Sequence, residues 1–227
     1  MNCFITGTDT GIGKTVVTCA LLSALRTSGH VAVGMKPVAA GVDALGQNDD
    51  VTALLASSSP TVPQSILNPY LMRSPTAPHL AAAEEGREIE WPVLDAAFQE
   101  ARANASRVLV EGVGGWCIPL SDTLMLADLP LRWDLPVILV AGIRLGALNH
   151  TLLTADAIRA SGCRLLGFVA NQVDPDYAWA GRTVDTLEAR IDAPCLARLS
   201  WRPDAHPSVF AEALTAAALA LDDVVTP

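Results

Sequence analysis

The glycine-rich stretch ITGTDTGIGKT, residues 5 to 15, constrains the fold of this chain more than any other feature. It begins within the apolar run CFIT, residues 3–6, and ends at the first residue of TVVTCALLSALRTSG, whose final glycine is a residue type common just after a helix. We therefore predict a strand, a tight turn and then a helix from about Lys14 to Ser28. Backbone amides in such a turn, at a helix N-terminus with its partial positive charge, form a binding site for phosphate groups.

Further short apolar runs alternate with longer helical or loop segments along the rest of the chain. These runs are VAVGM, RVLVEG, PVILVAG and RLLGFVANQ. Such alternation is typical of βαβ units, in which helices cover both faces of a parallel sheet. With 227 residues, of which 51% are hydrophobic, we predict one α/β domain over residues 1–227. The expected architecture is a three-layer fold like that of the P-loop nucleoside triphosphatases, with a mainly parallel central sheet.

Two segments interrupt this pattern, residues 37–50 and 59–79, and both are rich in proline, serine, asparagine and glycine. The regular α/β pattern resumes on either side of each segment. We therefore expect them to be functional loops and not linkers between domains.

Charge and cysteine content narrow the functional classes. A net charge of −9 without a cluster of basic residues argues against nucleic acid or an anionic membrane as a partner. Neither a leader-like start nor an apolar run of about 18 residues is present, so we expect a cytoplasmic protein. The cysteines have no metal-ligand spacing, and we expect buried, reduced thiols at Cys3, Cys19, Cys117, Cys163 and Cys195.

The loop contains most of the groups that a nucleotide triphosphate needs. Its glycines allow backbone amides to surround phosphate, its lysine can reach the outer phosphates, and its threonine hydroxyl can bind Mg²⁺. The loop is a variant, because the usual GxxxxGK[ST] pattern requires glycine where this chain has Thr8, and Gly7 comes one residue too early. A glycine-rich turn that caps a helix by chance is the alternative, and the flanking strand and helix fit it less well.

Carboxylates and a second lysine follow other predicted strands. Glu111 comes directly after RVLV, at the carboxyl edge of the sheet, where open α/β proteins bind ligands. Asp49 or Asp50 could supply a further oxygen to Mg²⁺, although spacing does not choose between them and the pair could equally be a helix cap and a solvated charge. Lys36 follows VAVGM at the same edge and would be a second anion-binding cation, although a lone lysine is normally a surface residue.

Taken together, GTDTGIGKT, KPVAAG, VEGVGGW, PLSD, NH at 149–150 and VANQV resemble the dethiobiotin synthetase family of biotin biosynthesis. The motifs occur in the same order from about residue 3 to residue 173. The resemblance implies a homodimeric, ATP- and Mg²⁺-dependent ligase that closes a ureido ring on 7,8-diaminopelargonic acid with CO₂. In the implied reaction one amine captures CO₂ as a carbamate, the carbamate attacks the γ-phosphate, and the second amine closes the ring.

The resemblance also implies roles for individual residues. Lys14 and Lys36 are implied to be catalytic, and the implied Mg²⁺ ligands are Thr15, Asp50 and Glu111, which selects Asp50 over Asp49. The residues implied to bind ATP are Gly11, Ile12, Gly13, Lys14, Thr15, Val16, Asp50, Glu111, Gly112, Val113, Gly114, Asn171, Gln172 and Ser200. Those implied to bind the substrate are Thr10, Lys36, Ala40, Gly114 and Asn149.

Asn171 and Asn149 are two of the assignments that depend on the resemblance alone. Asn171 is implied to recognise adenine, whereas its residue type and position would otherwise indicate a turn after the strand GFVA. Asn149 is implied to reach the substrate carboxylate from the partner subunit, which requires the dimer. The neighbouring His150 is better explained as a residue at the start of a helix than as a catalyst.

Three positions depart from the family pattern. Gly11 stands where some members have glutamate, and Ala40 stands where members often have a serine that bonds the substrate. The missing serine hydrogen bond corresponds to about 0.5 to 1.5 kcal/mol if nothing replaces it. Ser200 stands where members can have proline, and without the fixed φ of proline we expect a looser pocket for the base.

Three other functions are weighed against this one. A ParA/MinD-like dimeric ATPase that switches partners usually has an additional lysine near the start of its loop, and residues 7–10 contain none. A ligase for a larger acid such as a corrinoid usually has an added glutaminase domain, for which 227 residues leave no room. A dinucleotide site fits least, because GVGGW lacks the GxGxxG spacing and its acidic partner would have to be Asp134.

Overall fold

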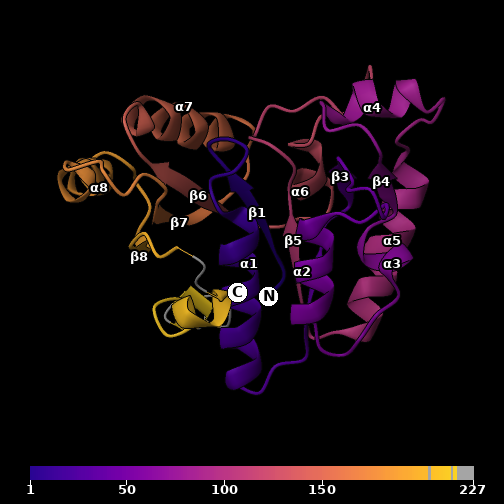
Figure 1. Cartoon of the computed structure of the whole chain (residues 1–227), viewed down its shortest axis with the longest axis horizontal. Helices are drawn as coiled ribbons and strands as arrows, with labels where there is room; N and C mark the ends of the chain where they lie inside the picture. The colour runs from indigo at the N-terminus through magenta and orange to yellow at the C-terminus, as the bar shows by residue number, and fades with distance from the viewer. Residues whose placement is uncertain (204–205, 216, 219–227) are drawn as a thin grey trace.

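The computed structural model describes residues 1–203, 206–215 and 217–218, and within them the central sheet has six strands. All five strand pairs are parallel, in the order β2-β5-β1-β6-β7-β8 (Figure 1). The strands are β1 (Cys3–Gly7), β2 (Ala32–Met35), β5 (Arg107–Glu111), β6 (Val137–Ile143), β7 (Leu165–Gln172) and β8 (Cys195–Leu199).

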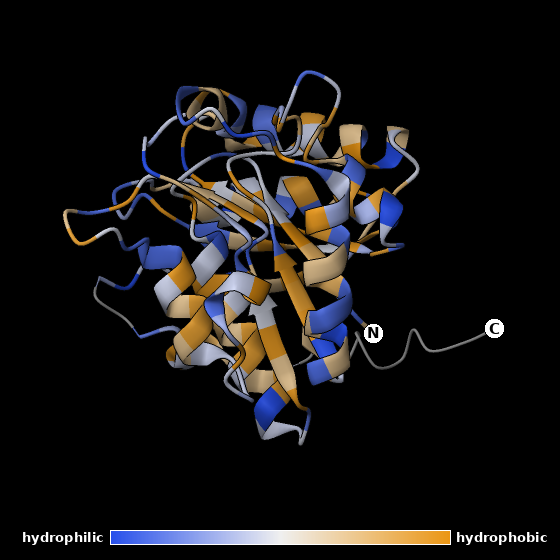
Figure 2. Cartoon of the chain, turned by 90° about the vertical axis from the view of Figure 1, so that its right-hand side faces the viewer, coloured by the Kyte–Doolittle hydropathy of each residue, from blue (hydrophilic) through white to orange (hydrophobic). Residues whose placement is uncertain are grey.

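Alternate residues of the central strands pack into two apolar layers, one on each face of the sheet. In β1, Ile5 belongs to the layer under α1, whereas Phe4 belongs to the opposite layer. The first face carries α1 (Lys14–Thr27), α2 (Asp49–Ser57) and the short 3₁₀ helix η1 (Pro207–Phe210). The second face carries α5 (Trp91–Asn104), α6 (Asp128–Arg132), α7 (Ala147–Ala160) and α8 (Ala180–Glu188). Figure 2 shows the apolar strands enclosed between helices that carry hydrophilic residues.

The predicted fold class is confirmed, since helices cover both faces of a parallel sheet and the five strands expected from apolar runs all form. The helix expected from about Lys14 to Ser28 is α1. The strand β8 was not predicted, because CLARL includes an arginine and only two of its five residues are fully buried. None of the helices in the described ranges has both the length and the apolar character needed to cross a bilayer.

The two segments expected to be irregular contain short regular elements, so that prediction is wrong in part. Residues 37–50 include β3 (Val38–Ala40) and the first turn of α2. Residues 59–79 include α3 (Gln64–Leu67), β4 (Tyr70–Met72) and the start of α4 (Pro78–Glu84). β3 and β4 pair in parallel as a separate sheet. Strands of three residues are too short to show a periodic pattern, and their pairing joins segments about 30 residues apart.

The expectation of buried thiols is confirmed for Cys3, Cys19 and Cys163, while Cys195 is half-buried and Cys117 is exposed. Cys117 is exposed because its neighbour Trp116 takes the inward position. The Trp116 ring packs edge-on against Phe4, with ring centroids 6.3 Å apart. All five cysteines are free thiols, and burial raises the pKa of Cys3 to about 12.

Because the six central strands are parallel, their carboxyl ends meet at one edge of the sheet, the upper edge in Figure 1. The loop after β1 begins there at Thr8. Lys36 directly follows β2, Glu111 is the last residue of β5, and Asn171 is the penultimate residue of β7. The topology thus brings together residues up to about 160 positions apart in the sequence.

Candidate nucleotide site

The glycine-rich loop is fixed to the sheet and adopts backbone conformations that require glycine. The amide of Thr8 donates to the carbonyl of Val140 at 3.1 Å, and its hydroxyl accepts from the amide of Gly142 at 3.3 Å. Gly13 caps α1 with a φ of 87°, in the left-handed region. A Cβ atom on Gly13 would also lie 2.3 Å from the side-chain nitrogen of Asn171. Conformation and space therefore both require glycine at this position.

Asn171 connects strand β7 to the loop. It is the penultimate residue of β7, and its Nδ2 atom donates to the carbonyl of Ile12 at 2.8 Å. The interpretation of Asn171 as a turn residue is therefore wrong, because it lies within the strand. Its amide rests against the loop that precedes α1.

The whole chain contains only two lysines among its 15 basic residues, Lys14 and Lys36, and both lie in this site. Lys14 is 7% exposed and Lys36 is 4% exposed, so the alternative of an ordinary surface lysine is wrong for Lys36. This compositional bias is a signal that the sequence itself contains. All the other basic residues are arginines, and buried lysine is rare unless it has a partner, so these two lysines are candidate functional residues.

Lys14 folds back over its own loop. Its Nζ atom donates to the backbone carbonyl of Asp9 at 2.8 Å. Burial, together with repulsion from Lys36, lowers the pKa of Lys14 from 10.5 to about 8. Asp50 and Glu111 oppose this shift but do not cancel it.

Lys36 lies between two carboxylates. Its Nζ atom forms a short ion pair with Asp50 and a second ion pair with Glu111 at 2.8 Å. Burial alone would lower the pKa of Lys36, but the two carboxylates outweigh it and hold that pKa above its ordinary value. For Asp50, burial likewise opposes ionisation, while Lys36 lowers the pKa of the carboxyl below its usual range. Lys36 and Asp50 therefore stabilise each other's charged forms.

The helix cap decides which aspartate faces the site. The N-cap of α2 is Asn48, whose side chain accepts a hydrogen bond from the amide of Val51 at 3.1 Å; Asp49 and Asp50 lie in the first turn of the helix. Asp49 is then exposed, whereas Asp50 turns inward. The geometry thus agrees with the choice of Asp50 over Asp49.

The oxygen atoms of Thr15, Asp50 and Glu111 form a set that fits a hard divalent cation. The Thr15 hydroxyl lies 2.7 Å from Asp50 Oδ1 and 2.8 Å from Glu111 Oε1, and its single proton cannot satisfy both carboxylates. Glu111 is fully buried, and its Oε2 atom has no hydrogen-bond partner among the described residues. In the described part of the chain no group of three or more His, Cys, Asp or Glu residues could hold a metal. A magnesium ion here would complete its coordination with phosphate oxygens and water.

The backbone of Lys36 is held by a segment that sequence reasoning did not associate with it. β2 ends at Met35, so the polar groups of Lys36 have left the sheet. Its amide donates to the carbonyl of Leu67 at 2.8 Å, and its carbonyl accepts from the buried side chain of Asn68 at 2.7 Å. No spacing rule could have identified Asn68, because the contact depends on how α3 packs beside β2.

A cavity of about 650 Å³ adjoins the loop. The predicted site residues that line it are Thr10, Gly11, Gly13, Lys14, Thr15, Val16, Lys36, Ala40, Asp50, Val113 and Gly114. The other residues that line the cavity were not assigned to the site from the sequence. They are Asn48, Pro75, Thr76, Ala77, Pro78, Ile118 and Pro119. The irregular segments therefore do contribute to the site, as expected of functional loops.

The other predicted residues lie outside this lining. Ile12, Gly112 and Glu111 are buried beside it. Gln172 is half-buried and donates to the carbonyl of Asp174 at 3.1 Å, and Ser200 is exposed directly after β8. Asn149 is exposed in the first turn of α7, so this chain does not bring it into its own cavity.

The backbone conformation of Gly11 disfavours any residue with a side chain. Its φ of 72° lies in the left-handed region, which is strained for other residues, although no described atom lies within 4 Å of a Cβ built there. A Cβ atom would therefore meet no neighbour at this position, but the backbone conformation favours glycine.

The fold and the loop geometry together define this chain as a P-loop nucleotide-binding protein of the α/β class. A family model described as an AAA domain matches residues 1–209. Two similar solved structures are the MinC:MinD cell division protein complex of Aquifex aeolicus, with a TM-score of 0.61 and 13% identity, and a ParA family ATPase from Chlorobium tepidum, with a TM-score of 0.59 and 14% identity. They cover 100% and 96% of this chain, and 97% and 98% of their own. At such identities the likeness shows the fold alone.

Sequence relatives give the particular family. An ATP-dependent dethiobiotin synthetase from Xanthomonas oryzae pv. oryzae is 49% identical over 214 residues, which cover 93% of this chain and 96% of the relative. A protein with the same name from Aromatoleum aromaticum is 48% identical over 93% of this chain and 95% of its own. The chain belongs to the ATP-dependent dethiobiotin synthetase family, and it is thus an ATP-dependent ligase.

Proposed function

We propose that this protein converts 7,8-diaminopelargonic acid, CO₂ and ATP into dethiobiotin, ADP and phosphate. The observation that carries the proposal is the position of Lys36, a buried ammonium that lies beside the phosphate loop and opens onto the same cavity as Lys14 and Thr15. A ligase that joins an anionic carbamate to a phosphoryl group needs cations at the point where the two anions meet. The site supplies two lysines there.

The phosphate loop would hold the triphosphate through its backbone amides, with Lys14 moving from the Asp9 carbonyl to the outer phosphates. Thr15, Asp50 and Glu111 would hold Mg²⁺, which supplies positive charge to the phosphate oxygens when it is bound. Val16 would flank the nucleotide on the helical side. Asn171, Gln172 and Ser200 lie at the ends of β7 and β8, where they would border the base.

Lys36 would orient the carbamate that forms on one substrate amine. A carbamate oxygen then forms a bond to the γ-phosphorus while the bond from phosphorus to ADP breaks. The second amine next forms a bond to the carbamate carbon, phosphate leaves with the C–O bonding electrons, and the amine protons pass to solvent. Because such steps need little covalent chemistry from the protein, positioning and charge provide most of the rate enhancement.

The remaining cavity wall suits the substrate's aliphatic chain. Pro75, Ala77 and Ile118 provide apolar surface, and Thr10, Ala40 and Gly114 line the same cavity. We propose that Asn149 reaches the substrate carboxylate of a partner subunit in a homodimer. Its exposure on α7 is consistent with a role outside its own cavity. We also propose a cytoplasmic location, where these small substrates and ATP occur.

The decisive experiment is an omission series. The purified protein is incubated with Mg-ATP, bicarbonate and the diamine, and dethiobiotin and phosphate are measured by mass spectrometry and colorimetry. We expect both products only when every component is present. Steady ATP hydrolysis that is indifferent to the diamine would support the partner-switching ATPase instead.

The pKa of Lys14 predicts how ATP affinity depends on pH. The protonated lysine is the form that binds phosphate, and its pKa of about 8 in the free protein lies below the 10.5 of an ordinary lysine. The affinity for Mg-ATP is therefore expected to fall as the pH rises through about 8, by up to about tenfold per pH unit. Calorimetric titrations between neutral and alkaline pH would measure it, and the Lys14→Ala variant should lack this dependence.

A further inference from the structure

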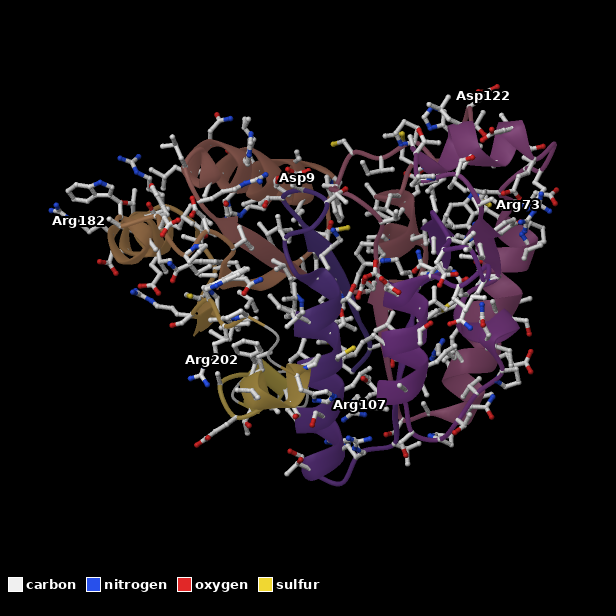
Figure 3. All side chains as sticks on the ribbon, in the orientation of Figure 1. Asp9, Arg73, Arg107, Asp122, Arg182 and Arg202 are labelled. Atoms are coloured by element: carbon white, nitrogen blue, oxygen red, sulfur yellow. The ribbon has the colours of Figure 1, made fainter. Side chains whose placement is uncertain are left out.

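Asp9 is the one acidic residue in the phosphate loop, residues 7–15. A carboxylate at this place opposes the binding of a triphosphate, because like charges repel across the short distances within a loop. The structure offers a partner for it from another part of the chain. Arg144, which follows β6, places its Nη2 atom 2.6 Å from Asp9 Oδ2. Figure 3 shows Asp9 on the loop above α1.

Asp9 also makes two contacts that shape the loop itself. Its Oδ1 atom accepts from the amide of Thr10 at 2.7 Å, and its backbone carbonyl accepts from the ammonium of Lys14 at 2.8 Å. Asp9 thus contacts Arg144, the amide of Thr10 and the ammonium of Lys14. A substitution at Arg144 would therefore change both the net charge of the loop and the position of the Lys14 side chain.

Stability alone does not explain the ion pair. Both side chains are about half exposed, at 43% for Arg144 and 48% for Asp9, and such pairs contribute little to folding. Because Asp9 belongs to the phosphate loop, the pair is better explained by its effect on the ligand.

We propose that Arg144 is a positioning residue for the nucleotide: it neutralises and fixes Asp9, so that the phosphate loop presents a net positive surface to the triphosphate. This inference rests on the proposed function, because it takes ATP as the ligand of the loop. It assigns Arg144 an action through Asp9 and no direct contact with the nucleotide.

A double-mutant cycle tests the proposal, with Mg-ATP binding measured by calorimetry. Arg144→Gln should raise the Kd about fivefold, which corresponds to the upper range for an exposed charge pair. Asp9→Asn keeps the acceptor for the Thr10 amide, removes the charge and should leave the Kd within about twofold of wild type. The double variant Asp9→Asn/Arg144→Gln should return to about the affinity of Asp9→Asn, and added salt should reduce the defect of Arg144→Gln.

Arg159→Gln is the matched control, because it removes an arginine that pairs with Asp156 at the far end of α7. We expect it to leave the Kd unchanged, and we expect all variants to melt within a few degrees of wild type. If the double variant binds as weakly as Arg144→Gln, Arg144 acts on the ligand directly and the proposal is wrong. If Arg144→Gln binds like wild type, it is equally wrong. A wild-type protein that does not bind Mg-ATP would contradict the proposed function itself.

Discussion

Replacement of Lys36 by alanine is expected to abolish dethiobiotin formation while ATP binding largely remains. Lys36 lies between Asp50 and Glu111, outside the phosphate loop, and the proposed mechanism uses it to hold the carbamate against the γ-phosphate. Removal of a preorganised charge of this kind lowers kcat by about 100- to 1000-fold. The rate is measured as dethiobiotin produced at saturating ATP.

Because the chain has only two lysines, chemical labelling of Lys14 can measure nucleotide binding in the Lys36→Ala variant. Lys14 is then the chain's single lysine, so an amine-directed reagent followed by peptide mass spectrometry reports on Lys14 separately from the N-terminus. ATP should protect Lys14 from the reagent as it does in wild type.

Alanine at position 36 leaves the buried Glu111 without its charge partner, which can cost about 3 to 5 kcal/mol of stability. The variant Lys36→Gln keeps a hydrogen-bond donor beside Glu111 and should remain folded but inactive. Normal product formation by folded Lys36→Gln would show that Lys36 is not an essential cation.

Replacement of Lys14 by alanine is expected to weaken ATP binding and thereby to abolish turnover. Hydrogen bonds from a charged group contribute roughly 1.5 to 3 kcal/mol, so we expect the Kd for Mg-ATP to rise by about 10- to 100-fold. The stability of the fold should not suffer in the same way. Lys14 contacts a backbone carbonyl, and its removal also relieves a burial cost that already lowers its pKa to about 8.

The two lysine variants should therefore fail for different reasons. Titration calorimetry with Mg-ATP separates them, since Lys36→Ala should bind and Lys14→Ala should bind poorly. An unchanged Kd in Lys14→Ala would remove this lysine from the phosphate site, whatever its rate. Arg159→Gln again serves as the control for the loss of one positive charge away from the site.

Local patterns were sufficient to predict the residues that lie together at the glycine-rich loop. Gly13, Lys14 and Thr15 follow from a strand, turn and helix within 30 residues. Glu111 and Lys36 follow from the rule that parallel strands end at one edge, and the structure indeed brings both to Thr15 and Asp50. The choice between Asp49 and Asp50 could not be made from spacing, because it depends on Asn48 acting as the cap of α2.

The contacts that sequence reasoning missed join segments with no fixed spacing. Asn68 holds Lys36 only because α3 packs beside the end of β2, and Arg144 reaches Asp9 from a loop 135 residues away. Residues 75–78, which form one wall of the cavity, were predicted to be part of a loop, but the sequence did not predict where that loop lies. Each of these depends on tertiary packing, which neither periodicity nor turn composition determines.

The close contact between Asn171 and the loop has a consequence for engineering of nucleotide selectivity. The amide that lies nearest the proposed base pocket also fills the space beside Gly13 and bonds the carbonyl of Ile12. A smaller residue at 171 would free the left-handed turn from its support, and a larger one would push against it. Under the proposed function, a change at Asn171 would alter both the contact with the base and the support of the phosphate loop, so variants with altered base preference should be sought at Ser200 before Asn171.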